Sequence, residues 1–182
     1  MEQILEIAIN ESSIRPYEIA VVMETVPGFL PPATLAEAGG KRVLLYSCEG
    51  LVPLARYGAG PGGAMALGAL FDLLCGYIRC LLAARDRLLD TRLLSSDPER
   101  GIFAAGAGGA VKAVWGADAL ADEGEKICRV AEALAKRERV MGAKPTMEKM
   151  IKITLSENLS LKHCLKAAES LCREWNHIVR PA

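Results

Sequence analysis

Three glycines in the first half of the chain have a spacing that can serve phosphate binding. Gly58, Gly60 and Gly63 match G-x-G-x-x-G and directly precede an apolar segment with helical spacing. A helix N-terminus offers free backbone N–H groups, so this loop could hold an anion or a nucleotide. The dinucleotide version also needs a buried strand before the loop and a second strand about twenty residues later. Residues 51–54 are interrupted by Pro53, and no second strand follows at that distance. No Gly-Lys-Ser/Thr follows the glycines, which excludes a Walker-type phosphate-binding loop. A flexible linker is therefore the favoured interpretation of this segment.

Side chains suited to acid–base or nucleophilic catalysis are few. The histidines are His163 and His177, and no H-E-x-x-H or G-x-S-x-G motif is present. His163 is next to Cys164, but adjacent residues of a helix do not face each other. Four acids could converge, although charges at a helix end are more typical of a solvated surface: Asp86, Asp90, Asp97 and Glu99.

The cysteines show no metal-binding or redox spacing. None of the six forms a C-x-x-C pair, and four lie in helical patterns beside Leu and Ala. We therefore expect buried free thiols in a reducing compartment, rather than disulfides or zinc ligands.

Composition excludes several classes of function. The chain has 182 residues, 51% of them apolar, with 22 basic and 22 acidic side chains. Zero net charge and the lack of a basic cluster predict no nucleic-acid partner. The most apolar window, residues 63–84, contains Asp72 and Arg79, which argues against a membrane span. Met1-Glu2-Gln3 does not resemble the start of a signal peptide, so we expect a cytoplasmic location.

The elements that would position these residues follow from periodicity and turns. Apolar residues over 64–89 have the spacing of a long helix packed on several sides, and a loop and a small hairpin at 102–115 follow it. Upstream we expect a helix at 17–24 and a hairpin at 33–47 with Gly39-Gly40 in its turn. The first fourteen residues suit either a short strand or an irregular lead-in.

Beyond Trp115 the pattern predicts three helices, with Thr146 and Ser160 as N-caps of the last two. The predicted fold class is α+β. The predicted domains are a small N-terminal lobe over 1–57, containing a helix and a β-hairpin, and a helical lobe over 58–182.

This order of elements resembles the catalytic-loop region of protein kinases. There, a buried helix leads into a loop with Pro-Glu-Asn, a two-strand hairpin and a metal-binding D-F-G. Here Asp97-Pro98-Glu99 and Trp115-Gly116 occupy those places, and residues 48–54 are placed like the hinge between kinase lobes. The chain is most similar to degenerate kinase-like domains. These are the cytoplasmic pseudokinase-like domain of the EssB/YukC membrane proteins of type VII secretion and the kinase-like domain N-terminal to forkhead-associated modules.

The resemblance covers roughly residues 17–155 and implies a truncated kinase-like fold whose catalytic groups are missing. H-R-D would fall on Leu93-Leu94-Ser95, so Ser95 stands where the catalytic aspartate would be. Pro98 and Glu99 are kept, but Arg100 replaces the metal-binding asparagine. D-F-G falls on 114–116 or one residue later, without an aspartate in either register.

The phosphate-binding part of a kinase is also absent. The first lysine is Lys41, in the later hairpin, whereas the resemblance requires a lysine before the first helix. The segment before that helix is too short for the glycine-rich strand pair. Phosphoryl transfer depends on positioning by that lysine, Mg²⁺ and the missing acids. The resemblance therefore implies no enzyme activity, no cofactor and no bound metal.

The function expected is a non-catalytic scaffold that binds a protein partner in a bacterial secretion or signalling assembly. One alternative is a small nucleotide-binding protein or enzyme that uses the Gly58–Gly63 loop. Another is a helical homodimer formed through the C-terminal apolar stripe that ends at Trp175.

Overall fold

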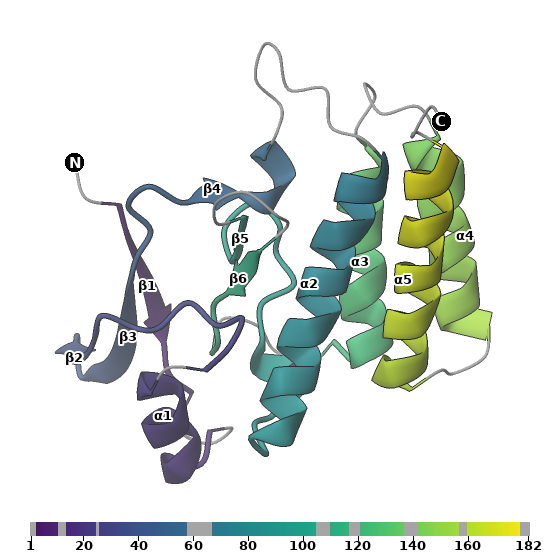
Figure 1. Cartoon of the computed structure of the whole chain (residues 1–182). Helices are drawn as coiled ribbons and strands as arrows, with labels where there is room; N and C mark the ends of the chain where they lie inside the picture. Colours follow the sequence, from purple (N-terminus) through teal and green to yellow (C-terminus); the bar gives the residue numbers. More distant parts are fainter. Residues whose placement is uncertain are drawn as a thin grey trace.

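The computed structural model describes residues 3–10, 14–24, 26–57, 67–104, 110–116, 121–136, 142–156 and 160–178. One antiparallel sheet and helix α1 lie at one end of the molecule, and helices α3, α4 and α5 lie at the other (Figure 1). Helix α2 and a second small sheet lie between them. The fold is α+β, as the sequence predicts.

The N-terminal sheet contains β1 (Ile4–Ala8), β2 (Thr34–Ala38) and β3 (Lys41–Ser47), in the order β1-β3-β2. Gly39 and Gly40 connect β2 to β3 with φ of 59° and 79°. Positive φ at both central residues is the requirement of a type I′ turn, whose twist matches that of the strands. The predicted hairpin is confirmed, and the N-terminal segment, for which two structures were possible, forms a strand.

The second sheet contains β4 (Val52–Pro53), β5 (Ile102–Ala104) and β6 (Val111–Ala113), all antiparallel. The predicted small hairpin is confirmed as β5 and β6. Strand β4 was not predicted, because two residues that include a proline show no alternation. It pairs with β5, so residues just before the Gly58–Gly63 segment contact the hairpin that follows the long helix.

Five α-helices complete the fold: α1 (Pro16–Met23), α2 (Leu67–Asp86), α3 (Glu123–Ala135), α4 (Ala143–Ser156) and α5 (Leu161–Ile178). Two short 3₁₀ turns, η1 (Leu54–Arg56) and η2 (Thr91–Leu93), lie in the connections. Helix α2 packs against α5 and α3, and α3 packs against α4. Ser160 caps α5 as predicted, because its hydroxyl accepts a hydrogen bond from the His163 N–H at 3.4 Å.

The prediction that Thr146 caps α4 is wrong. The helix begins at Ala143, and Thr146 lies in its first turn, where its hydroxyl donates to the Gly142 carbonyl at 2.7 Å. Pro145 does not end or delay the helix, because an N–H in the first turn has no intrahelical acceptor to lose.

A cluster of buried residues contains side chains from both of the lobes that the sequence predicts. It includes Leu44 of β3, Phe71 and Tyr77 of α2, and Val130 of α3, each at most 1% exposed. The division near residue 57 stays a prediction. Among the described residues, no helix is long and apolar enough to cross a membrane.

All six cysteines are buried and free, as predicted. Burial raises the pKa of the Cys75 and Cys80 thiols to about 12 and that of Cys128 to about 11. These thiols therefore stay protonated at neutral pH and are poor nucleophiles.

The positive φ of Leu88, just after the end of α2, can be tested by substitution. Its φ is 58°, a conformation that costs an L-residue roughly 1–2 kcal/mol, and its side chain is 74% exposed. Leu88→Gly should therefore raise the free energy of unfolding by about 1 kcal/mol, measured by chemical denaturation. The neighbouring exposed Arg87→Gly is the control and should lower stability, since glycine gains nothing where φ is negative. A loss of stability in Leu88→Gly would contradict this description of the turn.

Candidate functional site

The residues that match the kinase motifs meet where the loop after α2 crosses the segment after β6. We call residues 88–101 the connecting loop. Leu94 forms an antiparallel bridge with Trp115, and the Ser95 N–H donates to the Val114 carbonyl at 2.9 Å. The Gly116 N–H donates to the Leu93 carbonyl at 2.8 Å. The structure thus brings Ser95, Trp115 and Gly116 together.

Asp97, Pro98 and Glu99 form a tight turn within the connecting loop. The Asp97 carboxylate accepts hydrogen bonds from the N–H groups of Glu99 at 2.9 Å and Arg100 at 3.3 Å. The Ser95 hydroxyl accepts one from the Asp97 N–H at 3.2 Å. Both side chains therefore hold the turn, a common use of short polar residues.

This turn is also fixed against the segment that precedes Gly58. The Pro98 carbonyl accepts a hydrogen bond from the Ala55 N–H at 2.9 Å. Glu99 and Arg56 form an exposed ion pair at 3.7 Å, which contributes little by itself. Gly101 closes the turn, and a Cβ there would overlap the Ser95 hydroxyl.

A small hollow separates β1 from the connecting loop. Its volume is about 200 Å³, and its lining comes from β1, the loop and the segment after β6: Leu5, Ile7, Ser95, Asp97, Arg100, Gly101 and Val114. Pockets for small organic ligands are typically about 300–1,000 Å³. The hollow is too small for a nucleotide, and β1 contributes only apolar side chains to its wall.

Three fully buried side chains donate hydrogen bonds to backbone carbonyls around the loop. Tyr77 of α2 donates to the Ser95 carbonyl at 2.9 Å, and Lys126 of α3 donates to the Leu94 carbonyl at 2.7 Å. Tyr46 of β3 donates to the Trp115 carbonyl at 2.7 Å and accepts from the Trp115 N–H at 3.3 Å. Burial raises the pKa of Tyr46 above its ordinary value, which keeps the hydroxyl protonated as this pairing requires.

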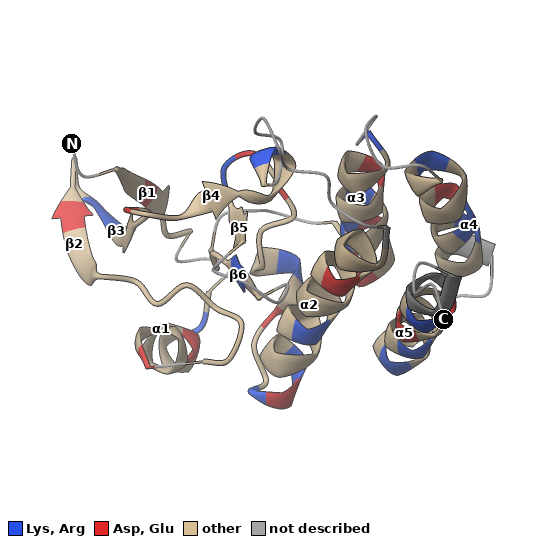
Figure 2. Ribbon diagram, turned by 45° about the horizontal axis from the view of Figure 1, so that its top comes forward, with Lys and Arg blue, Asp and Glu red and all other residues tan. Residues whose placement is uncertain are grey.

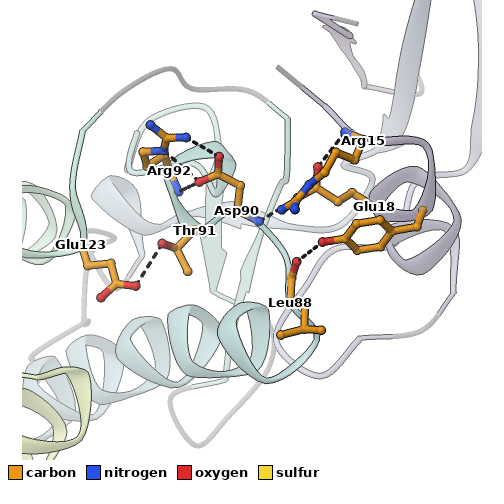
Figure 3. A network of polar contacts seen from close by, with 8 residues as sticks. Arg15, Glu18, Leu88, Asp90, Thr91, Arg92 and Glu123 are labelled. Atoms are coloured by element: carbon orange, nitrogen blue, oxygen red, sulfur yellow. Dashed lines mark hydrogen bonds and ion pairs between the residues drawn. The ribbon is translucent and has the colours of Figure 1, made fainter. Parts of the chain in front are cut away.

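The start of the connecting loop is tied to α1 and α3 by a second set of polar contacts (Figure 3). The Glu18 carboxylate, fully buried, accepts from the N–H groups of Asp90 at 2.9 Å and Arg15 at 2.8 Å. The Tyr17 hydroxyl donates to the Leu88 carbonyl at 2.5 Å. The Thr91 hydroxyl donates to Glu123 of α3 at 3.0 Å. These contacts anchor α1 to the start of the loop, in addition to the burial of its Ile19 and Val22 in the core.

Asp90 forms a two-contact pair with Arg92 in the same network. The Arg92 Nε lies 3.0 Å from Oδ1, and Nη2 lies 2.8 Å from Oδ2 of Asp90. Hydrogen bonding from Arg92 holds the Asp90 pKa below its ordinary value. A lowered folded-state pKa stabilises the protein above the ordinary pKa of the carboxyl group, and this contribution is lost as the pH falls through the lowered value.

Sequence analysis missed the side chains that fix the loop. Tyr46 and Tyr77 lie on apolar faces and are indistinguishable from core residues in the sequence, and Lys126 was not singled out. Nothing in their spacing indicates a carbonyl partner. Lys126 follows the N-cap Asp122 and precedes the apolar residues Ile127 and Val130. This position lies on the buried side of a strongly amphipathic helix, and it is the signal that was available for Lys126.

Two other predicted candidates are the glycine segment and the neighbouring His163 and Cys164. Gly58, Gly60 and Gly63 lie outside the described residues. His163 is exposed, with Nδ1 2.9 Å from the Ser160 hydroxyl, while Cys164 is buried. In the described part of the chain, no group of three or more His, Cys, Asp and Glu side chains could hold a metal ion.

No protein-family model matches the chain, and a search of curated proteins also found no match.

The Tyr46–Trp115 pairing can be tested by Tyr46→Phe. This change leaves two buried backbone groups of Trp115 without their partner, and we expect a loss of about 1–3 kcal/mol in the free energy of unfolding. Chemical denaturation measures it. Tyr17→Phe is the matched control, because Tyr17 is 40% exposed and water can replace its hydroxyl at the Leu88 carbonyl. Equal losses in the two variants would contradict a special role for Tyr46.

Proposed function

We propose that the chain is a non-catalytic, pseudokinase-like protein-interaction domain that acts as a cytoplasmic scaffold in a bacterial secretion or signalling assembly. The observation that carries the proposal is the arrangement of the connecting loop. Its polar side chains at Ser95 and Asp97 accept hydrogen bonds from the loop's own backbone, which is a structural use. Such a loop supports the surrounding elements instead of positioning a substrate.

The charges around the hollow are unsuited to phosphoryl transfer. That reaction needs acids that hold Mg²⁺ and a lysine that holds the phosphates. By the resemblance, Arg100 stands in place of a metal-binding asparagine, and Val114 in place of the metal-binding aspartate has no ligand atom in its side chain. Leu5 and Ile7 form the opposite wall without a lysine.

The order of elements supports the kinase-like part of the proposal. Helix α1, the β2–β3 hairpin, the long α2, the connecting loop, the β5–β6 hairpin and three helices follow in the order on which the resemblance rests. The proposed lobes are residues 1–57 and 58–182.

Surface charge supports a protein partner over a nucleic acid. Basic and acidic residues both occur on α3, α4 and α5, although lysines outnumber glutamate on α4, so these helices present mixed charge (Figure 2). A nucleic-acid site would require basic residues gathered on one face.

The proposal is tested by a thermal-shift titration with ATP and Mg²⁺. We expect no change in Tm at millimolar nucleotide, whereas an active kinase in the same plate should shift. A ligand at 100 times its Kd would add about 2.7 kcal/mol to stability, which is easily detected. A clear shift would contradict the proposal and favour the Gly58–Gly63 loop, in which case Gly60→Ala with Gly63→Ala should abolish it.

A further inference from the structure

Strand β1 is an edge strand whose outer side is available for pairing. It pairs with β3 on one side, and no described strand pairs with the other (Figure 1). Edge strands carry a row of unpaired N–H and carbonyl groups, which can add a strand from another chain.

The ladder with β3 identifies the backbone groups that face outward. The Ile9 N–H donates to the Arg42 carbonyl, and the Cys48 N–H donates to the Gln3 carbonyl, both at 2.9 Å. In an antiparallel pair, inward and outward residues alternate. The backbone groups of Leu5 and Ile7 therefore face β3, and those of Ile4, Glu6 and Ala8 face outward.

The outer edge of β1 lies beside the hollow. Leu5 and Ile7 point to the connecting loop and line the hollow with Arg100 and Val114. A strand added to β1 would direct alternate side chains to the same side as Leu5 and Ile7. These side chains would face the hollow beside Leu5 and Ile7, which gives strand addition an apolar contribution beyond the backbone hydrogen bonds. Strand β2, at the other edge of the sheet, contributes no residue to this hollow.

Charge indicates which kind of strand fits. Glu6 is exposed at the centre of β1, and no described residue forms an ion pair with it. Oppositely charged residues directly across two strands attract, and like charges repel. An antiparallel pairing of β1 with a second copy, centred on Glu6, would place the two Glu6 carboxylates opposite each other. A foreign strand with a basic residue at that position avoids this repulsion.

We propose that the outer edge of β1 binds an extended segment of a partner protein by strand addition. The segment carries Lys or Arg opposite Glu6, with apolar residues on either side of it that face the hollow. This inference rests on the proposed function, since it identifies the site at which the scaffold holds its partner.

The test uses ¹⁵N-labelled protein and two synthetic peptides, acetyl-Thr-Val-Lys-Val-Thr-amide and its Lys-to-Glu counterpart. Amide shifts should change at residues 4–8 and 95–101, and the Lys peptide should bind about fivefold more tightly. Glu6→Lys should reverse this preference, because it changes the sign of the central charge and leaves the backbone intact. Peptides that bind elsewhere, or a preference that does not reverse, would overturn the inference.

A proline variant tests the backbone contribution. Ala8→Pro removes one outward N–H of β1 and should weaken binding at least about fivefold, since proline is tolerated at an edge only where no hydrogen bond is needed. Glu37→Pro, which by the same alternation removes an outward N–H of β2, is the matched control and should bind like the wild type. If Ala8→Pro no longer unfolds cooperatively, the reversal of the peptide preference in Glu6→Lys is the deciding measurement.

Two further measurements separate the alternatives. Sedimentation that shows self-association abolished by Ala8→Pro would place a second copy on the edge and overturn the inference. Titration of the same samples with ATP and Mg²⁺ separates this inference from the proposed function. Absence of peptide binding without a nucleotide effect overturns the edge site alone, whereas a nucleotide effect overturns the proposed function.

Discussion

The middle of the connecting loop, residues 93–96, is buried, and its backbone groups need partners that no regular element provides. A buried carbonyl or N–H group without a partner costs about 1–3 kcal/mol. Tyr77 from α2, Lys126 from α3 and Glu18 from α1 satisfy groups of the loop itself, and Tyr46 from β3 satisfies Trp115, which lies beside the loop. Each comes from a different element, so the loop can form only when the N-terminal sheet and the helices are in place around it. The position of α1 and the packing of β3 on Trp115 both depend on this constraint.

The polar side chains of the connecting loop are largely engaged within the protein. The Ser95 and Asp97 side chains bond the loop backbone, whereas Asp90, Thr91 and Glu99 pair with other side chains. The space beside the loop is a hollow of about 200 Å³ with an apolar wall from β1. A stable loop beneath an unpaired strand edge fits a surface that receives another protein. We therefore connect the loop to the proposed scaffold function through the hollow that it lines together with β1.

Sequence reasoning predicted the elements that depend on local signals. The apolar spacing of α2 and the Gly39-Gly40 turn were sufficient, because helix periodicity and turn chemistry act over a few residues. Strand β4 was missed because two residues have no period, and Thr146 was misplaced because Pro145 is compatible with a first helical turn. The roles of Tyr46 and Lys126 were beyond sequence reasoning, since each bonds a carbonyl that only tertiary packing brings near. The Gly58–Gly63 segment lies outside the described residues, so its interpretation stays a prediction.

Native-state hydrogen exchange measures the central claim, that the connecting loop is a fixed part of the core. The reporters are the amides of Ser95, Gly101, Val114 and Gly116, all of which donate to backbone carbonyls in or beside the loop. If the loop opens only with the whole protein, their free energies of exchange will equal those of the buried amides in the centre of α2. Exchange of these amides at a free energy several kcal/mol below that of α2 would show that the loop opens independently, and would contradict the account.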